Sequence, residues 1–129
     1  MADEPLSVLY VEDDDGIRMI GEMALADVGG MQVRACASGD EALAAVQSFR
    51  PDLLVLDVMM PGMDGPATLK ALRELPQTAA VPAVFMTAKI MPHEVEGLKK
   101  LGAIEVVPKP FDPMTIAETL RDIWRRRPQ

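Results

Sequence analysis

Five short apolar runs stand out along the chain, and segments with a different spacing of apolar residues separate them. The runs cover residues 6–11, 31–37, 52–58, 81–87 and 103–107. Runs 52–58 and 81–87 are almost continuously apolar, which is typical of strands that helices cover on both faces. Run 31–37 alternates more between apolar and polar residues, which favours an edge strand. The pattern therefore predicts five strands.

Between these runs, apolar residues recur at steps of three and four, the spacing of one helix face. Strands that alternate with helices predict parallel strands joined by crossover connections. The expected fold class is α/β: a flavodoxin-like, doubly wound, five-stranded parallel sheet in strand order 2-1-3-4-5 with five helices. The residues expected to face the core from the five helices are Ile17, Ile20, Ala24, Leu25 and Val28; Ala42, Leu43 and Val46; Leu69, Leu72 and Leu75; Leu98 and Leu101; and Ile116, Leu120, Ile123 and Trp124.

Length and charge narrow the classes of function. The 129 residues suit a single domain over residues 1–129, with a core at about 6–125 and a short basic C-terminal tail. Thirteen basic residues against twenty acidic ones give a formal net charge of −7, which argues against nucleic acid or an anionic membrane as a partner. The one cysteine, Cys36, suits a reducing compartment, and no apolar run reaches the ~18 residues of a membrane-spanning helix. A cytoplasmic protein is expected.

Chemically active side chains follow four of the five predicted strands. Glu12 and Asp13 come directly after the first strand, the third strand ends in Asp57, the fourth ends in Thr87, and Lys109 follows the fifth. The carboxyl ends of parallel strands meet at one edge of a sheet, where ligands bind at the topological switch point. We therefore expect three carboxylates, a hydroxyl and an ammonium to line one pocket.

This set of groups indicates phosphoryl chemistry with a metal ion. Three carboxylates within ~4–6 Å of one another cannot all stay ionised at neutral pH without a cation. Mg²⁺ is the cation preferred where phosphate shares the coordination shell. Asp57, the central acid, could accept a phosphoryl group as a nucleophile. Mg²⁺ would then bridge Asp13, Asp57 and a phosphoryl oxygen, while Lys109 and the Thr87 hydroxyl would take the other oxygens.

Four segments in this order carry a family resemblance: "VLYVEDD", "PDLLVLDVMMPGMDG", "VFMTA" and "VPKPF". Over roughly residues 6–125 the chain resembles the receiver domain of two-component response regulators, of the chemotaxis-regulator type. The resemblance implies that Asp57 is phosphorylated by a histidine kinase or a histidine phosphotransfer protein. It also implies that Lys109–Pro110 is a cis peptide bond.

The resemblance assigns further roles around the phosphoacceptor. Glu12 and Asp13 match the family's acidic pair for Mg²⁺, with Asp13 touching the metal and Glu12 reaching it through water, and the backbone carbonyl of Met59 matches a further ligand. Thr87 matches the switch hydroxyl and Lys109 the phosphoryl-binding lysine. A downstream protein target is expected on the surface of helix 4, strand 5 and helix 5. The domain is not expected to be an enzyme, beyond catalysing its own phosphoryl uptake and dephosphorylation.

Two positions depart from the usual family pattern. Val106 stands where the family has an aromatic switch residue, so the signal is expected to travel through Thr87 and the following loop. The bulky side chain of Met59, two residues after Asp57, is expected to hinder the attacking water and slow hydrolysis of the phosphoryl group. Lys89 lies two residues after Thr87, the same spacing as that of Met59 after Asp57.

Several alternatives stay open from the sequence. A phosphatase of the haloacid-dehalogenase type also uses an aspartyl nucleophile, although it carries a second Asp where this chain has Met59. An interaction module with a vestigial site is the other rival. Within the acidic row, Asp14 and Asp15 are expected to begin the first helix, but a shift by one residue would make Asp13 and Asp14 the metal pair. The chain could act alone or be part of a longer regulator or hybrid kinase.

Overall fold

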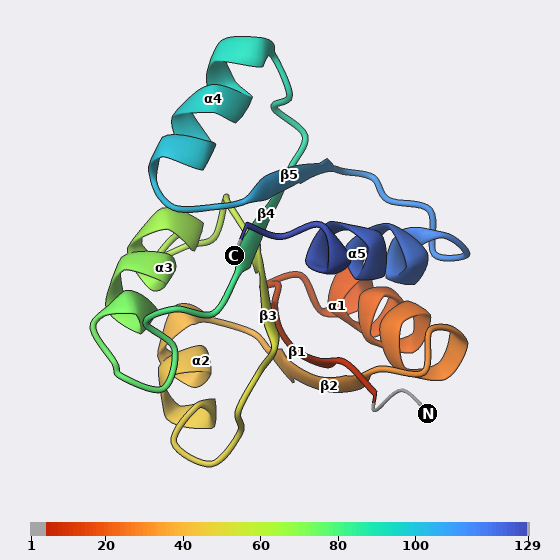
Figure 1. The fold of residues 1–129 in the computed structure, drawn as a ribbon. Helices are drawn as coiled ribbons and strands as arrows, with labels where there is room; N and C mark the ends of the chain where they lie inside the picture. The colour runs from red at the N-terminus through yellow and green to blue at the C-terminus, as the bar shows by residue number, and fades with distance from the viewer. Residues whose placement is uncertain (1–4, 129) are drawn as a thin grey trace.

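A computed structural model describes residues 5–128 as one five-stranded sheet wrapped by helices (Figure 1). All strand pairs are parallel, and the strand order is β2-β1-β3-β4-β5. The strands are β1 (Ser7–Val11), β2 (Gln32–Cys36), β3 (Leu53–Asp57), β4 (Ala83–Thr87) and β5 (Glu105–Pro108). The helices are α1 (Asp15–Glu22), which continues as the π-helix η1 (Met23–Val28), α2 (Gly39–Ala45), α3 (Gly65–Arg73), α4 (Pro92–Lys100) and α5 (Ile116–Arg125). The predicted α/β fold and strand order are confirmed.

Helices cover both faces of the sheet and create two cores. On one face, η1 and α5 bury residues such as Leu25 and Leu120 against Val55 of β3. On the other face, α2 and α3 cover Leu54 and Phe85, and Figure 1 shows these two helices opposite α1 and α5. Every residue of β3 and β4 is buried, as the continuously apolar runs predict, and the more alternating β2 is an edge strand.

Side-chain oxygens cap the N-termini of three of the helices. The carboxylate of Asp14 accepts a hydrogen bond from the Ile17 N–H, and Asp64 and Ser38 do the same for α3 and α2. Each oxygen satisfies one of the N–H groups that a helix leaves unpaired in its first turn. Asp14 is therefore a helix cap, which places the start of α1 directly behind the end of β1.

The predicted inner face of the first helix is partly wrong. Ile20 and Val28 are 50% and 55% exposed, whereas Ala24 and Leu25 are buried. Val28 is exposed because the π-helical turn from Met23 adds residues per turn and rotates the following side chains away from the α-helical spacing. Ile20 precedes this turn and lines an open apolar pocket with Phe111 instead of packing in the core. The predicted core position of Leu101 is also wrong, because α4 ends at Lys100 and the leucine side chain is 58% exposed.

Candidate functional site

The carboxyl ends of β1 and β3 bring three acids together. One carboxylate oxygen each from Glu12, Asp13 and Asp57 lies within 4.8 Å of the other two. Glu12 and Asp57 are buried, whereas Asp13 is partly exposed. The three positions share the edge because β1 pairs directly with β3 in parallel. This edge therefore offers a compact set of hard oxygen ligands, one of which faces solvent.

Lys109 closes the site from the segment that follows β5. Its ammonium lies 2.8 Å from Glu12 Oε1 and 3.3 Å from Asp57 Oδ1. The backbone N–H of Lys109 donates to the Thr87 carbonyl at 3.0 Å, which fixes the residue beside the end of β4. Lys109–Pro110 is a cis peptide bond, as the family resemblance implies. Four predicted site residues therefore converge.

Burial and charge set the protonation of the two buried partners. Burial and the neighbouring Glu12 charge raise the pKa of Asp57 to about 6, although the Lys109 ammonium opposes this. For Lys109, burial favours the neutral amine, but the hydrogen bond to Glu12 and the charges of both acids outweigh it and raise its pKa. Asp57 is therefore ionised at neutral pH, and Lys109 remains charged.

The loop after β1 is held by backbone hydrogen bonds. The Glu12 N–H donates to the Cys36 carbonyl at 3.0 Å, and the Asp14 N–H donates to Glu12 Oε2 at 3.1 Å. The structure groups Glu12 and Asp13 with Asp57 and leaves Asp14 as a helix cap. The shift by one residue, with Asp13 and Asp14 as the metal pair, is therefore not supported. Arg18, which sequence reasoning missed, also contacts this loop.

Thr87 lies at the end of β4, the strand next to β3, and is buried. Its hydroxyl accepts a hydrogen bond from the Lys89 N–H at 3.0 Å. Among residues 5–128, no hydrogen bond joins this hydroxyl to Glu12, Asp13 or Asp57. Thr87 is therefore on the same edge as the acids but is engaged with the loop that leads to α4.

The two atypical positions differ in exposure. Met59 follows β3, and its side chain is 64% exposed. Val106 lies in β5 opposite Phe85, and its partly buried side chain packs against the core on the sheet face that α2 and α3 cover. An aliphatic residue at this place fills the core without an aromatic ring that could rotate.

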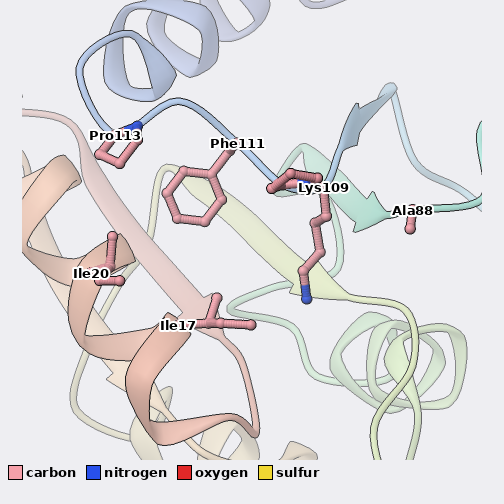
Figure 2. Close-up of a pocket in the computed structure, with 7 residues that line it drawn as sticks. Ile17, Ile20, Ala88, Lys109, Phe111 and Pro113 are labelled. Carbon is pink, nitrogen blue, oxygen red and sulfur yellow. The ribbon is translucent and has the colours of Figure 1, made fainter.

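An apolar pocket of about 420 Å³ adjoins the acidic site (Figure 2). In Figure 2, Ile17 and Ile20 project from α1 towards the Phe111 ring and the Lys109 side chain. Lys109 belongs to both the pocket and the acidic site, so the pocket lies directly beside the acidic site. The residues lining the pocket are Ile17, Ile20, Ala88, Lys109, Pro110, Phe111 and Pro113.

A doubly wound parallel sheet with a lysine-bridged acidic cluster at its carboxyl edge defines a class of α/β proteins that bind ligands at the topological switch point. Within that class, residues 8–121 match the family model of the response regulator receiver domain. The chain belongs to this family and is a receiver domain of a two-component response regulator.

Curated relatives support this assignment. The response regulator Rre1 of Synechocystis is 34% identical over 125 residues, which cover 96% of this chain and 54% of that protein. The transcriptional regulatory protein CseB of Streptomyces avermitilis is 36% identical over 123 residues, with 95% of this chain and 51% of that protein covered. The chain thus spans about half the length of these relatives.

Solved structures agree with the same family. Chemotaxis response regulator CheY4 of Vibrio cholerae superposes with a TM-score of 0.85 at 35% identity, over 93% of this chain and 99% of that one. A Francisella response regulator receiver domain superposes with a TM-score of 0.82 at 26% identity, over 95% of this chain and 98% of that one. The family resemblance read from the sequence is confirmed. Among residues 5–128, no helix has both the length and the apolar character needed to cross a bilayer.

Proposed function

We propose that this chain is a phosphoacceptor switch of a two-component system or phosphorelay, in which Asp57 takes a phosphoryl group from a phosphohistidine. The observation that carries the proposal is the position of the Lys109 ammonium between the buried Glu12 and Asp57 carboxylates. With Asp13, three carboxylates and one ammonium give −3 + 1 = −2 when all are ionised. A divalent cation neutralises this charge.

The residues present fit Mg²⁺. Glu12, Asp13 and Asp57 each offer one carboxylate oxygen within 4.8 Å of the others, and carboxylate oxygens are the ligands that Mg²⁺ prefers. The Met59 carbonyl, in the segment after β3, would supply a further oxygen ligand. When bound, Mg²⁺ supplies positive charge that offsets the negative charge of the phosphoryl oxygens.

The transfer step uses groups that the fold already holds. An ionised Asp57 oxygen forms a bond to phosphorus while the phosphorus–nitrogen bond of the donor breaks, and the electron pair of that bond stays on the imidazole nitrogen. Lys109, 3.3 Å from Asp57 Oδ1, holds its charge where a phosphoryl oxygen arrives. The Thr87 hydroxyl, which accepts a hydrogen bond from the Lys89 N–H, would donate its own O–H to a phosphoryl oxygen. In this proposal the chain does not act as an enzyme on other substrates and catalyses only its own phosphorylation and dephosphorylation.

A histidine kinase, a histidine phosphotransfer protein, or both would be the donor, in a cytoplasmic setting. A donor protein has to bring an imidazole to Asp57, past the rim formed by α1 and the segment after Lys109. The apolar pocket on this rim supports such docking, because Phe111 and Ile20 would accept an apolar side chain of the donor. The net charge of −7 keeps nucleic acid outside the proposal for this chain, although some curated relatives are transcriptional regulators.

The signal would be read on the surface of α4, β5 and α5. Thr87 leads through Lys89 to the start of α4 at Pro92, and no residue of α4 is buried. A helix with few buried apolar contacts is held weakly and can shift at low cost. Movement of the Thr87 hydroxyl would therefore change this surface first.

The test is phosphorylation of the purified chain by acetyl phosphate with Mg²⁺, followed by intact mass measurement. We expect a gain of one phosphoryl group that disappears in Asp57→Asn and when the metal is chelated. Absence of any gain in the unchanged protein, together with no uptake of beryllofluoride, would favour the vestigial interaction module. Continuous turnover of a generic phosphate ester, lost in Asp57→Asn, would favour the phosphatase.

A further inference from the structure

The side chain of Arg18 spans the whole loop between β1 and α1. Its Nη1 donates to the Glu12 carbonyl at 2.9 Å and to the Asp13 carbonyl at 3.4 Å. Its Nη2 donates to Asp15 Oδ1 at 2.6 Å. One guanidinium therefore binds three of the four residues in the acidic row, and the side chain is only 22% exposed.

The two carbonyl contacts act on the residues whose carboxylates form the candidate metal site. The backbone of Glu12 is already held on its other side by the hydrogen bond from its N–H to the Cys36 carbonyl. Arg18 adds the only side-chain donor to the Asp13 backbone among the described residues. Asp13 is partly exposed and lies beyond the end of β1, so the sheet ladder alone does not fix its orientation.

We propose that Arg18 is a positioning residue for the Mg²⁺ site: by binding the carbonyls of Glu12 and Asp13, it holds the Asp13 carboxylate where it meets Asp57. This inference rests on the metal site of the proposed function. Arg18 does not touch the metal or the phosphoryl group. It acts by reducing the number of loop conformations that metal binding has to exclude.

A purely electrostatic role of Arg18 would change the Mg²⁺ affinity in the opposite direction, so the two roles can be distinguished by experiment. If Arg18 acts on the site only through its charge, it repels Mg²⁺, and its removal strengthens metal binding. If it positions the loop, its removal weakens binding. The ion pair with Asp15 contributes little to either effect, because the Asp15 side chain is 89% exposed.

Arg121 provides a matched control. It also projects from a helix, pairs with a carboxylate three residues earlier, and donates to a loop carbonyl, that of Gly29, at 2.6 Å. Its side chain is 26% exposed, close to that of Arg18. Arg121 binds the end of η1 rather than the acidic loop, so its replacement removes the same kind of contact without touching the metal site.

The experiment is isothermal titration of the purified chain with MgCl₂, for the unchanged protein, Arg18→Ala, Arg18→Lys and Arg121→Ala. We expect about tenfold weaker Mg²⁺ binding for Arg18→Ala, the size typical of lost outer contacts to metal ligands. Arg18→Lys, which keeps the charge but offers its donors from a single nitrogen, should recover part of the loss. Arg121→Ala should bind Mg²⁺ as the unchanged protein does, although its melting temperature falls.

A second measurement separates positioning from a general loss of structure. The acetyl phosphate reaction of Arg18→Ala should need more Mg²⁺ for half-maximal rate, yet reach about the unchanged maximal rate when Mg²⁺ saturates. Equal or tighter Mg²⁺ binding in Arg18→Ala, or an equal loss in Arg121→Ala, would overturn the inference. If Arg18→Ala does not fold, unchanged Mg²⁺ affinity in Arg18→Lys and Arg18→Gln overturns it. No Mg²⁺ binding by the unchanged protein would instead refute the metal site of the proposed function.

Discussion

Replacing Asp57 by asparagine removes a negative charge that the fold keeps almost entirely from water. The Asp57 side chain is 6% exposed, and burial together with the Glu12 charge raises its pKa from 3.8 to about 6. Such a rise means that ionising this carboxyl costs ~3 kcal/mol more in the folded than in the unfolded chain. Because asparagine keeps part of the cost of a buried polar group, we expect a gain in unfolding free energy of ~1–2 kcal/mol at neutral pH without metal.

The contribution of Asp57 to the unfolding free energy changes with pH in a definite direction. The folded pKa of Asp57 lies above the unfolded value, so the folded chain holds the proton longer as pH rises. The unchanged protein therefore loses stability between about pH 4 and pH 6 through this group, and the loss is constant above that range. The advantage of Asp57→Asn should accordingly be small near pH 4 and reach its full size above about pH 6.

Urea unfolding with a chelator present measures this difference. The free energy of unfolding, extrapolated to zero urea, is compared for both proteins near pH 4 and above pH 7. Asp40→Asn is the control, because Asp40 is exposed in the first turn of α2 and its loss should slightly destabilise the helix. Equal stability of Asp57→Asn and the unchanged protein at neutral pH would refute the reasoning, as would an advantage that stays the same near pH 4.

Four further substitutions test the packing of the fold and the chemistry of the site. Gly65→Ala should lower the unfolding free energy by ~2–4 kcal/mol, because a Cβ there overlaps the backbone at the end of β3. Gly97→Ala, which has open space around it in α4, should raise the unfolding free energy by ~0.5–1 kcal/mol. Urea unfolding measures both changes, and equal effects of the two substitutions would contradict this prediction. Tyr10→Phe should leave unfolding free energy unchanged or raise it by ~1 kcal/mol, since the buried Tyr10 hydroxyl has no hydrogen-bond partner among the described residues, and a clear loss would reveal a hidden partner. Phosphoryl loss from Asp57, followed by intact mass, should be slow and should quicken in Met59→Asn; a half-life of seconds in the unchanged protein would contradict it.

The convergence of the site could be predicted because parallel strands leave little freedom. Continuous apolar runs identified β3 and β4 as central strands, Glu12 and Asp13 follow β1 directly, and Asp57 is the last residue of β3. Once the strand order places β1 beside β3, Asp57 and Glu12 have to meet at the same edge. The convergence was thus predicted from the order of the strands and from the residues at or directly after the end of each strand.

The π-helical turn could not be predicted from apolar spacing. Counting steps of three and four assumes 3.6 residues per turn, and η1 breaks this rule between Met23 and Val28. Its end is held by tertiary contacts: Gly29 packs against Ala117 of α5, and Arg121 donates to the Gly29 carbonyl. These contacts join segments far apart in the sequence, so no local pattern reveals them.

The acidic row after β1 shows why sequence spacing identified the acids but not the way their repulsion is reduced. Glu12 is offset by the Lys109 ammonium and by the Asp14 N–H, Asp14 caps α1, and Asp15 is paired with Arg18. Within residues 5–128, only the Asp13 carboxylate of this row makes neither a hydrogen bond nor an ion pair. Because the protein already engages three of the four acids, the row presents one carboxylate without a protein partner beside Asp57, and this is where the proposed Mg²⁺ would bind.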